Sequence, residues 1–146
     1  MKIKKLLFAS ALLFSAYNAS AQTQVIAHRG FWKTEGSAQN SIAALLKADS
    51  IGCYGSEFDV WLAADDQLVV NHDPTFKGKR MENSPSTALT AIKLDNGESL
   101  PTLAKYLKAA QPLHTRLILE LKAHSTPLRE TKPSKKSLPW SKTWDW

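Results

Sequence analysis

Two carboxylates alternate with apolar side chains in residues 55–62, and no other feature restricts the possible folds of this chain as strongly. Successive side chains of a strand point to opposite faces, so Glu57 and Asp59 share one face. The opposite face of the strand predicted at 57–62 is apolar and consists of Phe58, Val60 and Leu62. Charged groups in such surroundings cost stability unless they are paired or bind something. The alternative is an ordinary half-exposed strand with one solvated face.

Three further short apolar runs predict strands, and each leads into polar residues. They cover residues 25–27, 68–71 and 117–122. Apolar residues at helical spacing predict one helix from residue 42 to Gly52 and a second helix from about 100 to 110.

The order of these elements is strand, helix, two strands, loop, helix and strand. This order predicts an α/β domain with a largely parallel sheet. The two strands joined by the short turn at residues 63–67 break the pattern. Either that pair is antiparallel, or the turn hides a reduced crossover. Residues 75–98 are polar and irregular, and we expect a long loop with one short helix there.

A third carboxylate is expected near the first two. On the strand predicted at 117–122, Glu120 and Lys122 share a face. Glu57, Asp59 and Glu120 can therefore converge, and a hard divalent cation would relieve their mutual repulsion. Oxygen ligands alone suit Mg²⁺ or Ca²⁺ better than Zn²⁺. Lys122 is a further cation in the same place and is suited to a phosphate.

Two histidines, His28 and His72, each follow an apolar run and are candidates for a general acid and a general base. A lone histidine in such a place is more often structural, but two at comparable strand ends favour catalysis. Arg29 offers a planar fork for an oxyanion or a phosphate. Asn40 either binds the same ligand or caps the following helix, and its residue type favours the cap.

Other notable residues have no predicted role in chemistry. Cys53 is the only cysteine, which excludes an intramolecular disulfide and favours a small buried apolar residue. We expect His114 and His124 on the surface. Trp32 and Trp61 fit either the wall of a substrate site or an ordinary core, and the sequence does not separate these two interpretations.

The first 21 residues have the form of a secretory signal peptide. Three lysines precede an apolar segment at 6–17 that is short for a bilayer span, and residues 19–21 form a small-residue cleavage site. We therefore expect cleavage before Gln22, no stable membrane anchor, and a periplasmic or secreted protein. The same lysines supply three of the six net positive charges, so the charge balance predicts no nucleic-acid partner.

The last residues, 123–146, differ in composition from the rest of the chain. Three prolines, several lysines and three tryptophans occur there without the period of a strand or a helix. We expect a disordered tail, or a frameshifted reading frame beyond about Ala123.

Six short motifs, taken together, carry a resemblance to a known family. They are His28-Arg29-Gly30, Gln39-Asn40-Ser41, Glu57-Phe58-Asp59-Val60, Val70-Asn71-His72-Asp73-Pro74, Leu100-Pro101-Thr102-Leu103 and Leu119-Glu120-Leu121-Lys122. In this order and approximate spacing, the region from about Val25 to Lys122 resembles the glycerophosphodiester phosphodiesterase family. One departure is local. The family usually has Pro-Glu-Asn-Thr where this chain has Ala38-Gln39-Asn40-Ser41, so Gln39 lacks the negative charge of that glutamate.

The resemblance implies a TIM (β/α)₈ barrel, a divalent metal, and hydrolysis of a small-molecule glycerophosphodiester to an alcohol and glycerol 3-phosphate. It implies His28 and His72 as the acid–base pair, with Arg29 and Lys122 on the phosphate. The metal ligands that it implies are Glu57, Asp59 and Glu120. Such a barrel needs about 250 residues. Residues 22–122 are therefore expected to be its N-terminal half, truncated after about the fourth strand.

Half a barrel has open sheet edges, which invite pairing with another chain. Three possibilities therefore stand beside an active phosphodiesterase. The chain is an inactive half-barrel fragment, a homodimer that completes the barrel, or a phosphate- or divalent-metal-binding module without turnover.

Overall fold

A computed structural model describes residues 23–126 of the 146-residue chain. The predicted signal peptide at 1–21 and most of the predicted tail, from residue 127 onward, lie outside the described residues. Among the helices of the described part, none combines the length and the apolar character that a membrane crossing requires.

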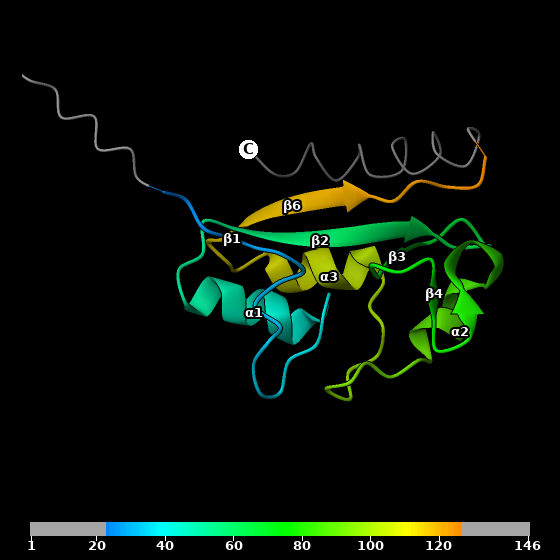
Figure 1. Cartoon of the computed structure of the whole chain (residues 1–146), viewed down its shortest axis with the longest axis horizontal. Coiled ribbons are helices and arrows are strands. Elements are labelled where there is room, and N and C mark those ends of the chain that lie inside the picture. The colour runs from blue at the N-terminus through cyan, green and yellow to red at the C-terminus, as the bar shows by residue number, and fades with distance from the viewer. Residues whose placement is uncertain (1–22, 127–146) are drawn as a thin grey trace, which may run out of the picture.

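The central element of the sheet is β2 (Gly55–Leu62), all of whose residues are buried. Two strands run parallel to it, β1 (Ile26–Ala27) and β6 (Arg116–Leu121), whereas β3 (Leu68–Val70) runs antiparallel. The turn at residues 63–67 therefore joins an antiparallel pair, and the reduced crossover is excluded. Figure 1 shows β6 lying along β2 for most of its length.

Two helices lie on one face of this sheet (Figure 1). Helix α1 (Ile42–Ser50) begins after Ser41, and helix α3 (Leu103–Ala110) begins after Thr102. In both cases the hydroxyl of the preceding residue accepts a backbone N–H of the first turn. These caps satisfy N–H groups that have no partner inside the helix, which explains where both helices start.

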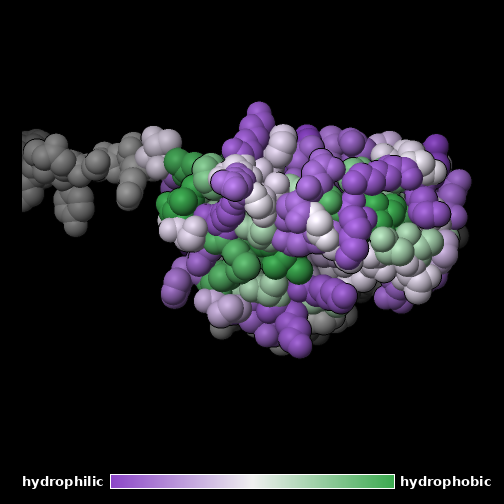
Figure 2. Space-filling view, turned by 90° about the horizontal axis from the view of Figure 1, so that it is seen from below, coloured by the Kyte–Doolittle hydropathy of each residue, from purple (hydrophilic) through white to green (hydrophobic). Residues whose placement is uncertain are grey.

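The apolar face of β2 packs under these helices. The buried members of this core include Leu45, Phe58, Val60, Leu62 and Tyr106. The rings of Phe58 and Tyr106 lie 4.6 Å apart between centroids. The predicted orientation of the apolar residues of β2 is therefore confirmed. Seen from the side of the helices (Figure 2), the surface is mainly hydrophilic and is interrupted by smaller apolar areas.

The segment between β3 and α3 is more ordered than the sequence suggests. It forms a hairpin of β4 (Thr75–Phe76) and β5 (Lys79–Arg80), a 3₁₀ turn η1 (Met81–Asn83) and helix α2 (Ser86–Thr90). The short helix is confirmed, whereas the expectation of loop elsewhere is wrong for the hairpin and η1.

A second core holds this segment against the sheet. Its members include Trp61, Val69, Met81, Leu89 and Leu100. Phe76 and Met81 stand singly among polar residues, so the hairpin and η1 show no strand or helix period in the sequence. The same core settles one open question, because Trp61 is 5% exposed and belongs to it.

Candidate functional site

The register of β1 against β2 places the residues that follow β1 beside Glu57. Ala27 is paired with Ser56. The next residue after Ala27 is His28, and the next residue after Ser56 is Glu57. The backbone N–H of Arg29 donates to Oε2 of Glu57 at 2.8 Å, and Nε2 of His28 lies 3.8 Å from the same oxygen. The loop after β1 is thus attached to the carboxylate face of β2.

Gly30 allows this loop to turn closely against α1. Its φ is +76°, and a Cβ at this position would lie 2.6 Å from Cβ of Ala44. A larger residue would displace the loop, which explains the glycine of the motif. Arg29 has a φ of +61°, an uncommon conformation for a residue with a long side chain. Contacts on both sides of Arg29 maintain it, and such outliers are typical of functional sites.

The antiparallel return of β3 brings His72 back to the middle of β2. The strand pairs with the last three residues of β2, and the N–H of Asn71 then donates to the carbonyl of Asp59 at 3.0 Å. The indole Nε1–H of Trp61 donates to the carbonyl of His72 at 3.3 Å. Residues that follow β3 therefore reach the same stretch of β2 as residues that follow β1.

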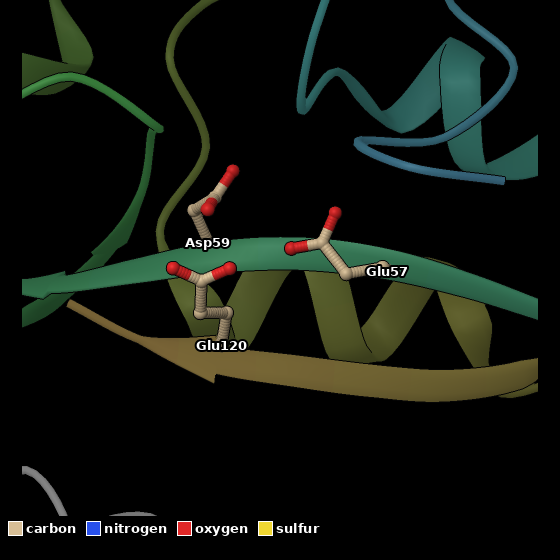
Figure 3. Close-up of side chains that lie close together, drawn as sticks. All are labelled: Glu57, Asp59 and Glu120. Carbon is tan, nitrogen blue, oxygen red and sulfur yellow. The ribbon is translucent and has the colours of Figure 1, made fainter. Parts of the chain in front are cut away.

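The parallel pairing of β6 with β2 sets Glu120 opposite Asp59. One carboxylate oxygen from each of Glu57, Asp59 and Glu120 lies within 4.8 Å of the other two. In Figure 3 the first two side chains rise from β2 and the third from β6, with their carboxylates gathered on one side. The structure thus brings together the three carboxylates that strand alternation placed on one face.

The ammonium group of Lys122 lies within this carboxylate cluster. Its Nζ is 2.6 Å from Oδ1 of Asp59 and 2.6 Å from Oε1 of Glu120. Burial alone would lower the pKa of Lys122, but hydrogen bonds and charges from both carboxylates raise it above its usual value. Lys122 was expected on a phosphate, and in this structure its partners are the two carboxylates.

Glu57 is the least satisfied carboxylate of the cluster. Burial raises the pKa of Glu57, and the charges of Asp59 and Glu120 raise it further, against the opposing effects of the Arg29 N–H and His28. Its Oε1 is buried and accepts no hydrogen bond from any of the described residues, 23–126. A buried oxygen without a partner, facing two further carboxylates, fits a hard divalent cation. Oxygen donors of this kind are common to Mg²⁺ and Ca²⁺ sites.

Asn40 belongs to the site and is not the helix cap. Its Nδ2 donates to Oδ2 of Asp59 at 2.8 Å, and its Oδ1 accepts the Asp59 N–H at 3.1 Å. The cap of α1 is Ser41. The φ of Asn40 is +58°, a conformation that asparagine tolerates better than most residues. The cap interpretation of Asn40 is wrong because its partner lies on another element and leaves no local signal.

Arg29, His72 and Asp73 form a hydrogen-bonded series beside the cluster. Nη2 of Arg29 is 2.8 Å from Nε2 of His72, and Nδ1 of His72 is 2.8 Å from Oδ1 of Asp73. A guanidinium can only donate, so Nε2 is the acceptor and Nδ1 carries the proton shared with Asp73. Nη1 of Arg29 donates to Oε1 of Gln39 at 2.5 Å. Gln39, the local departure from the family motif, thus contacts the predicted phosphate-binding arginine.

A pocket of about 190 Å³ opens beside His72. Trp32 and Phe76 line this pocket, and Trp32 is half-buried, so it is not an ordinary core residue. The charged and amide side chains of the wall are Lys33, Gln39, Asn71, Asp73 and Asp95. His72 is itself part of the wall of this pocket.

The other two histidines and the cysteine lie apart from the carboxylate cluster. His114 is exposed, as expected. His124 is 7% exposed, and its Nε2 accepts the backbone N–H of Leu62 at 2.9 Å. The surface prediction for His124 is wrong because the residues after β6 fold over the end of β2. Cys53 is half-buried.

Known proteins with similar sequences or folds are phosphodiesterases, although no family model matches the sequence. The structure of a glycerophosphodiester phosphodiesterase from Parabacteroides distasonis has 53% identity and a TM-score of 0.79, covering 82% of this chain and 51% of that one. A phosphodiesterase from Oleispira antarctica, solved with the product sn-glycerol-3-phosphate, has 28% identity and a TM-score of 0.69, covering 84% and 53%.

A curated relative gives the same description. The glycerophosphodiester phosphodiesterase of Caldanaerobacter subterraneus subsp. tengcongensis is 48% identical over 54 residues, which cover 37% of this chain and 21% of that protein. The chain therefore spans about half the length of the solved relatives and about a fifth of the curated one. The expected fold class is confirmed, since the described sheet and helices correspond to part of the α/β barrel of these enzymes.

Proposed function

This chain is related to the glycerophosphodiester phosphodiesterases over about half of their length, and on that premise we propose that it hydrolyses glycerophosphodiesters. The products would be an alcohol and glycerol 3-phosphate. The observation that carries the proposal is the meeting of three carboxylates with the Arg29–His72 pair on one face of β2. The product held by the Oleispira antarctica relative supports the same substrate class.

The carboxylate cluster is the proposed metal site. Glu57, Asp59 and Glu120 would hold Mg²⁺ or Ca²⁺, and such an ion supplies polarisation of a phosphoryl oxygen when bound. Lys122 already lies against two of these carboxylates. Its ammonium group would add positive charge where the phosphate binds, together with the guanidinium of Arg29.

His28 and His72 are the proposed acid–base pair. The hydrogen bonds of His72 leave the lone pair on Nε2, so this atom can take a proton from the attacking water molecule. Asp73 would then stabilise the imidazolium through the hydrogen bond to Nδ1. His28, exposed beside Glu57, would give a proton to the oxygen of the leaving alcohol. For both steps Arg29 would exchange its contact with His72 for one with the phosphate.

The pocket beside His72 is the proposed place for one alcohol group of the diester. Its aromatic rings would contact the carbon atoms of that group, and its polar side chains would bind hydroxyl or charged substituents. The position of His72 in the wall would then put the phosphate of the diester close to the proposed general base.

An assay of glycerol 3-phosphate release from glycerophosphocholine tests the proposal. Release is expected to stop with EDTA and to return with Mg²⁺ or Ca²⁺. His28→Ala and His72→Ala should each lower kcat by about 10²- to 10⁴-fold, because that is the usual contribution of an acid–base group. Both variants should still bind the metal in calorimetry, and the exposed His114→Ala serves as the control.

Absence of release from folded protein at every Mg²⁺ and Ca²⁺ concentration would contradict the proposal. Retained metal binding in that case would instead support a binding module without turnover. The homodimer that completes a barrel stays a prediction, which sedimentation velocity measures.

Export of the protein is also proposed, from the signal peptide predicted at 1–21. The mature chain purified from a periplasmic extract or from the medium should begin at Gln22, which intact mass spectrometry detects. Recovery of the full 146-residue chain from the cytoplasm alone would contradict export.

A further inference from the structure

Residues 122–126 follow β6 and are here termed the β6 extension. They are hydrogen-bonded to the end of β2. The N–H of Lys122 donates to the carbonyl of Val60 at 3.0 Å, directly after Val60 and Leu121, the last paired residues of the two strands. Beyond it, Nε2 of His124 accepts the N–H of Leu62 at 2.9 Å. The side chain of His124 thus continues the attachment of β6 after the backbone pairing ends.

A second attachment lies one residue further on. The N–H of Ser125 is 3.1 and 3.2 Å from the two carboxylate oxygens of Glu82, and its hydroxyl donates to Oε2 at 2.6 Å. Glu82 is buried and belongs to η1. The β6 extension is therefore bonded both to β2 and to the segment that follows β5.

His124 also contacts the residue that supports His72. The imidazole of His124 meets the indole of Trp61 at 5.3 Å between centroids and an interplanar angle of 64°. Trp61 is 5% exposed, and its Nε1–H donates to the carbonyl of His72. A continuous series of contacts therefore runs from His124 through Trp61 to the backbone of His72.

We propose that His124 is a positioning residue that holds Lys122 and His72 in place together. The proposal rests on the phosphodiesterase function proposed above, for which these two side chains are phosphate-binding and acid–base groups. Lys122 lies two residues from His124 on the same attached segment, and His72 is reached through Trp61. The ends of strands fray unless they are attached. Loss of the bond to Leu62 would therefore first loosen the β6 extension, which contains Lys122. The indole of Trp61 would lose one packing partner at the same time.

The test separates this bond from simple packing. His124→Phe keeps an aromatic ring against Trp61 but removes the nitrogen that accepts the N–H of Leu62. His124→Asn and His124→Gln carry an amide oxygen that can accept the same N–H. We expect His124→Phe to lower kcat/KM about 10- to 100-fold, the range that small misplacements of reacting groups produce. At least one amide variant should restore most of this loss.

The control is His114→Phe, the same substitution at an exposed histidine, which should change kcat/KM by less than twofold. If His124→Phe matches the wild type, or if neither amide variant restores a loss seen in folded protein, the positioning role is overturned. Amide hydrogen exchange at Leu62 and the indole N–H signal of Trp61 provide a readout without turnover. Exchange at Leu62 should change in His124→Phe and return in the rescuing amide variant, whereas the Trp61 signal should shift in the amide variants, which lack the aromatic ring.

This readout keeps the two proposals apart. If the wild type releases no glycerol 3-phosphate, the phosphodiesterase function fails, and the attachment of the β6 extension is judged by exchange at Leu62. If the wild type is active and exchange at Leu62 in His124→Phe is unchanged, the attachment fails alone.

Discussion

The Nζ atom of Lys122 lies 2.6 Å from Oδ1 of Asp59, a carboxylate with no exposed side-chain surface. Removing one partner of a buried ion pair leaves an uncompensated charge, which costs about 3–5 kcal/mol. Lys122→Met should therefore lower the free energy of unfolding by about that amount in metal-free buffer. Urea denaturation monitored by circular dichroism measures the change.

A divalent cation should restore part of this loss, because it supplies positive charge to the carboxylates that Lys122 leaves. The matched control is Lys105→Met, at an exposed position of α3, which should change stability by less than about 0.5 kcal/mol. Equal effects of the two substitutions would contradict the importance of the buried pair.

The sequence alone could place Glu57, Asp59 and Glu120 on one side of the sheet, because the two-residue period of a strand is a local property. It could not place His72. That position depends on the direction of β3, and a five-residue turn after β2 is compatible with more than one connection. The antiparallel pairing of β3 decides it, and this pairing is a tertiary contact.

The ionisation of Glu57 should contribute to the pH dependence of the free energy of unfolding. Burial raises the pKa of Glu57 above its ordinary value of 4.5, so the folded state favours the neutral acid. This contribution to stability is complete below about pH 4.5 and is lost as the pH rises through the raised pKa. Glu57→Gln imitates the neutral acid at every pH. It should match the wild type at low pH and exceed its stability near neutral pH in EDTA.

Urea denaturation between pH 3 and pH 8 measures this difference, with the exposed Glu35→Gln as the control. Parallel stability curves for the wild type and Glu57→Gln would contradict the raised pKa. Addition of Mg²⁺ or Ca²⁺ at pH 7 should reverse the order. A ligand at 100 times its Kd stabilises the folded state by about 2.7 kcal/mol, and the variant lacks one proposed ligand.

The pair formed by Asn40 and Asp59 should be important for stability. Asn40→Gly keeps the positive φ accessible but removes both hydrogen bonds, and we expect a loss of about 2–4 kcal/mol. Asn40→Ala should lose about 1 kcal/mol more, because an alanine is strained at this φ. Thermal and urea unfolding of the two variants measure these losses. Wild-type stability in Asn40→Gly would show that the two hydrogen bonds contribute little.

The sequence assigned Asn40 and His124 wrongly, and for a common reason. Each has its decisive partner far along the chain, at separations of 19 and 62 residues. Their local settings favour ordinary interpretations, a helix cap for one and a surface residue for the other. Only the register of the sheet shows that Asp59 lies beside Asn40 and that the end of β2 lies under His124.

The pocket beside His72 should affect substrate binding more than the chemical step. Phe76→Ala removes an aromatic wall without touching the carboxylates or Arg29, so we expect KM for glycerophosphocholine to rise about tenfold, equivalent to about 1.4 kcal/mol. Because this contact is made equally in the bound substrate and the transition state, kcat should stay within about twofold. Phe31→Ala is the matched control, since Phe31 is 40% exposed and is not part of the pocket wall. Steady-state kinetics on both variants measure the effect, and wild-type values of both KM and kcat in Phe76→Ala would place the substrate outside this pocket.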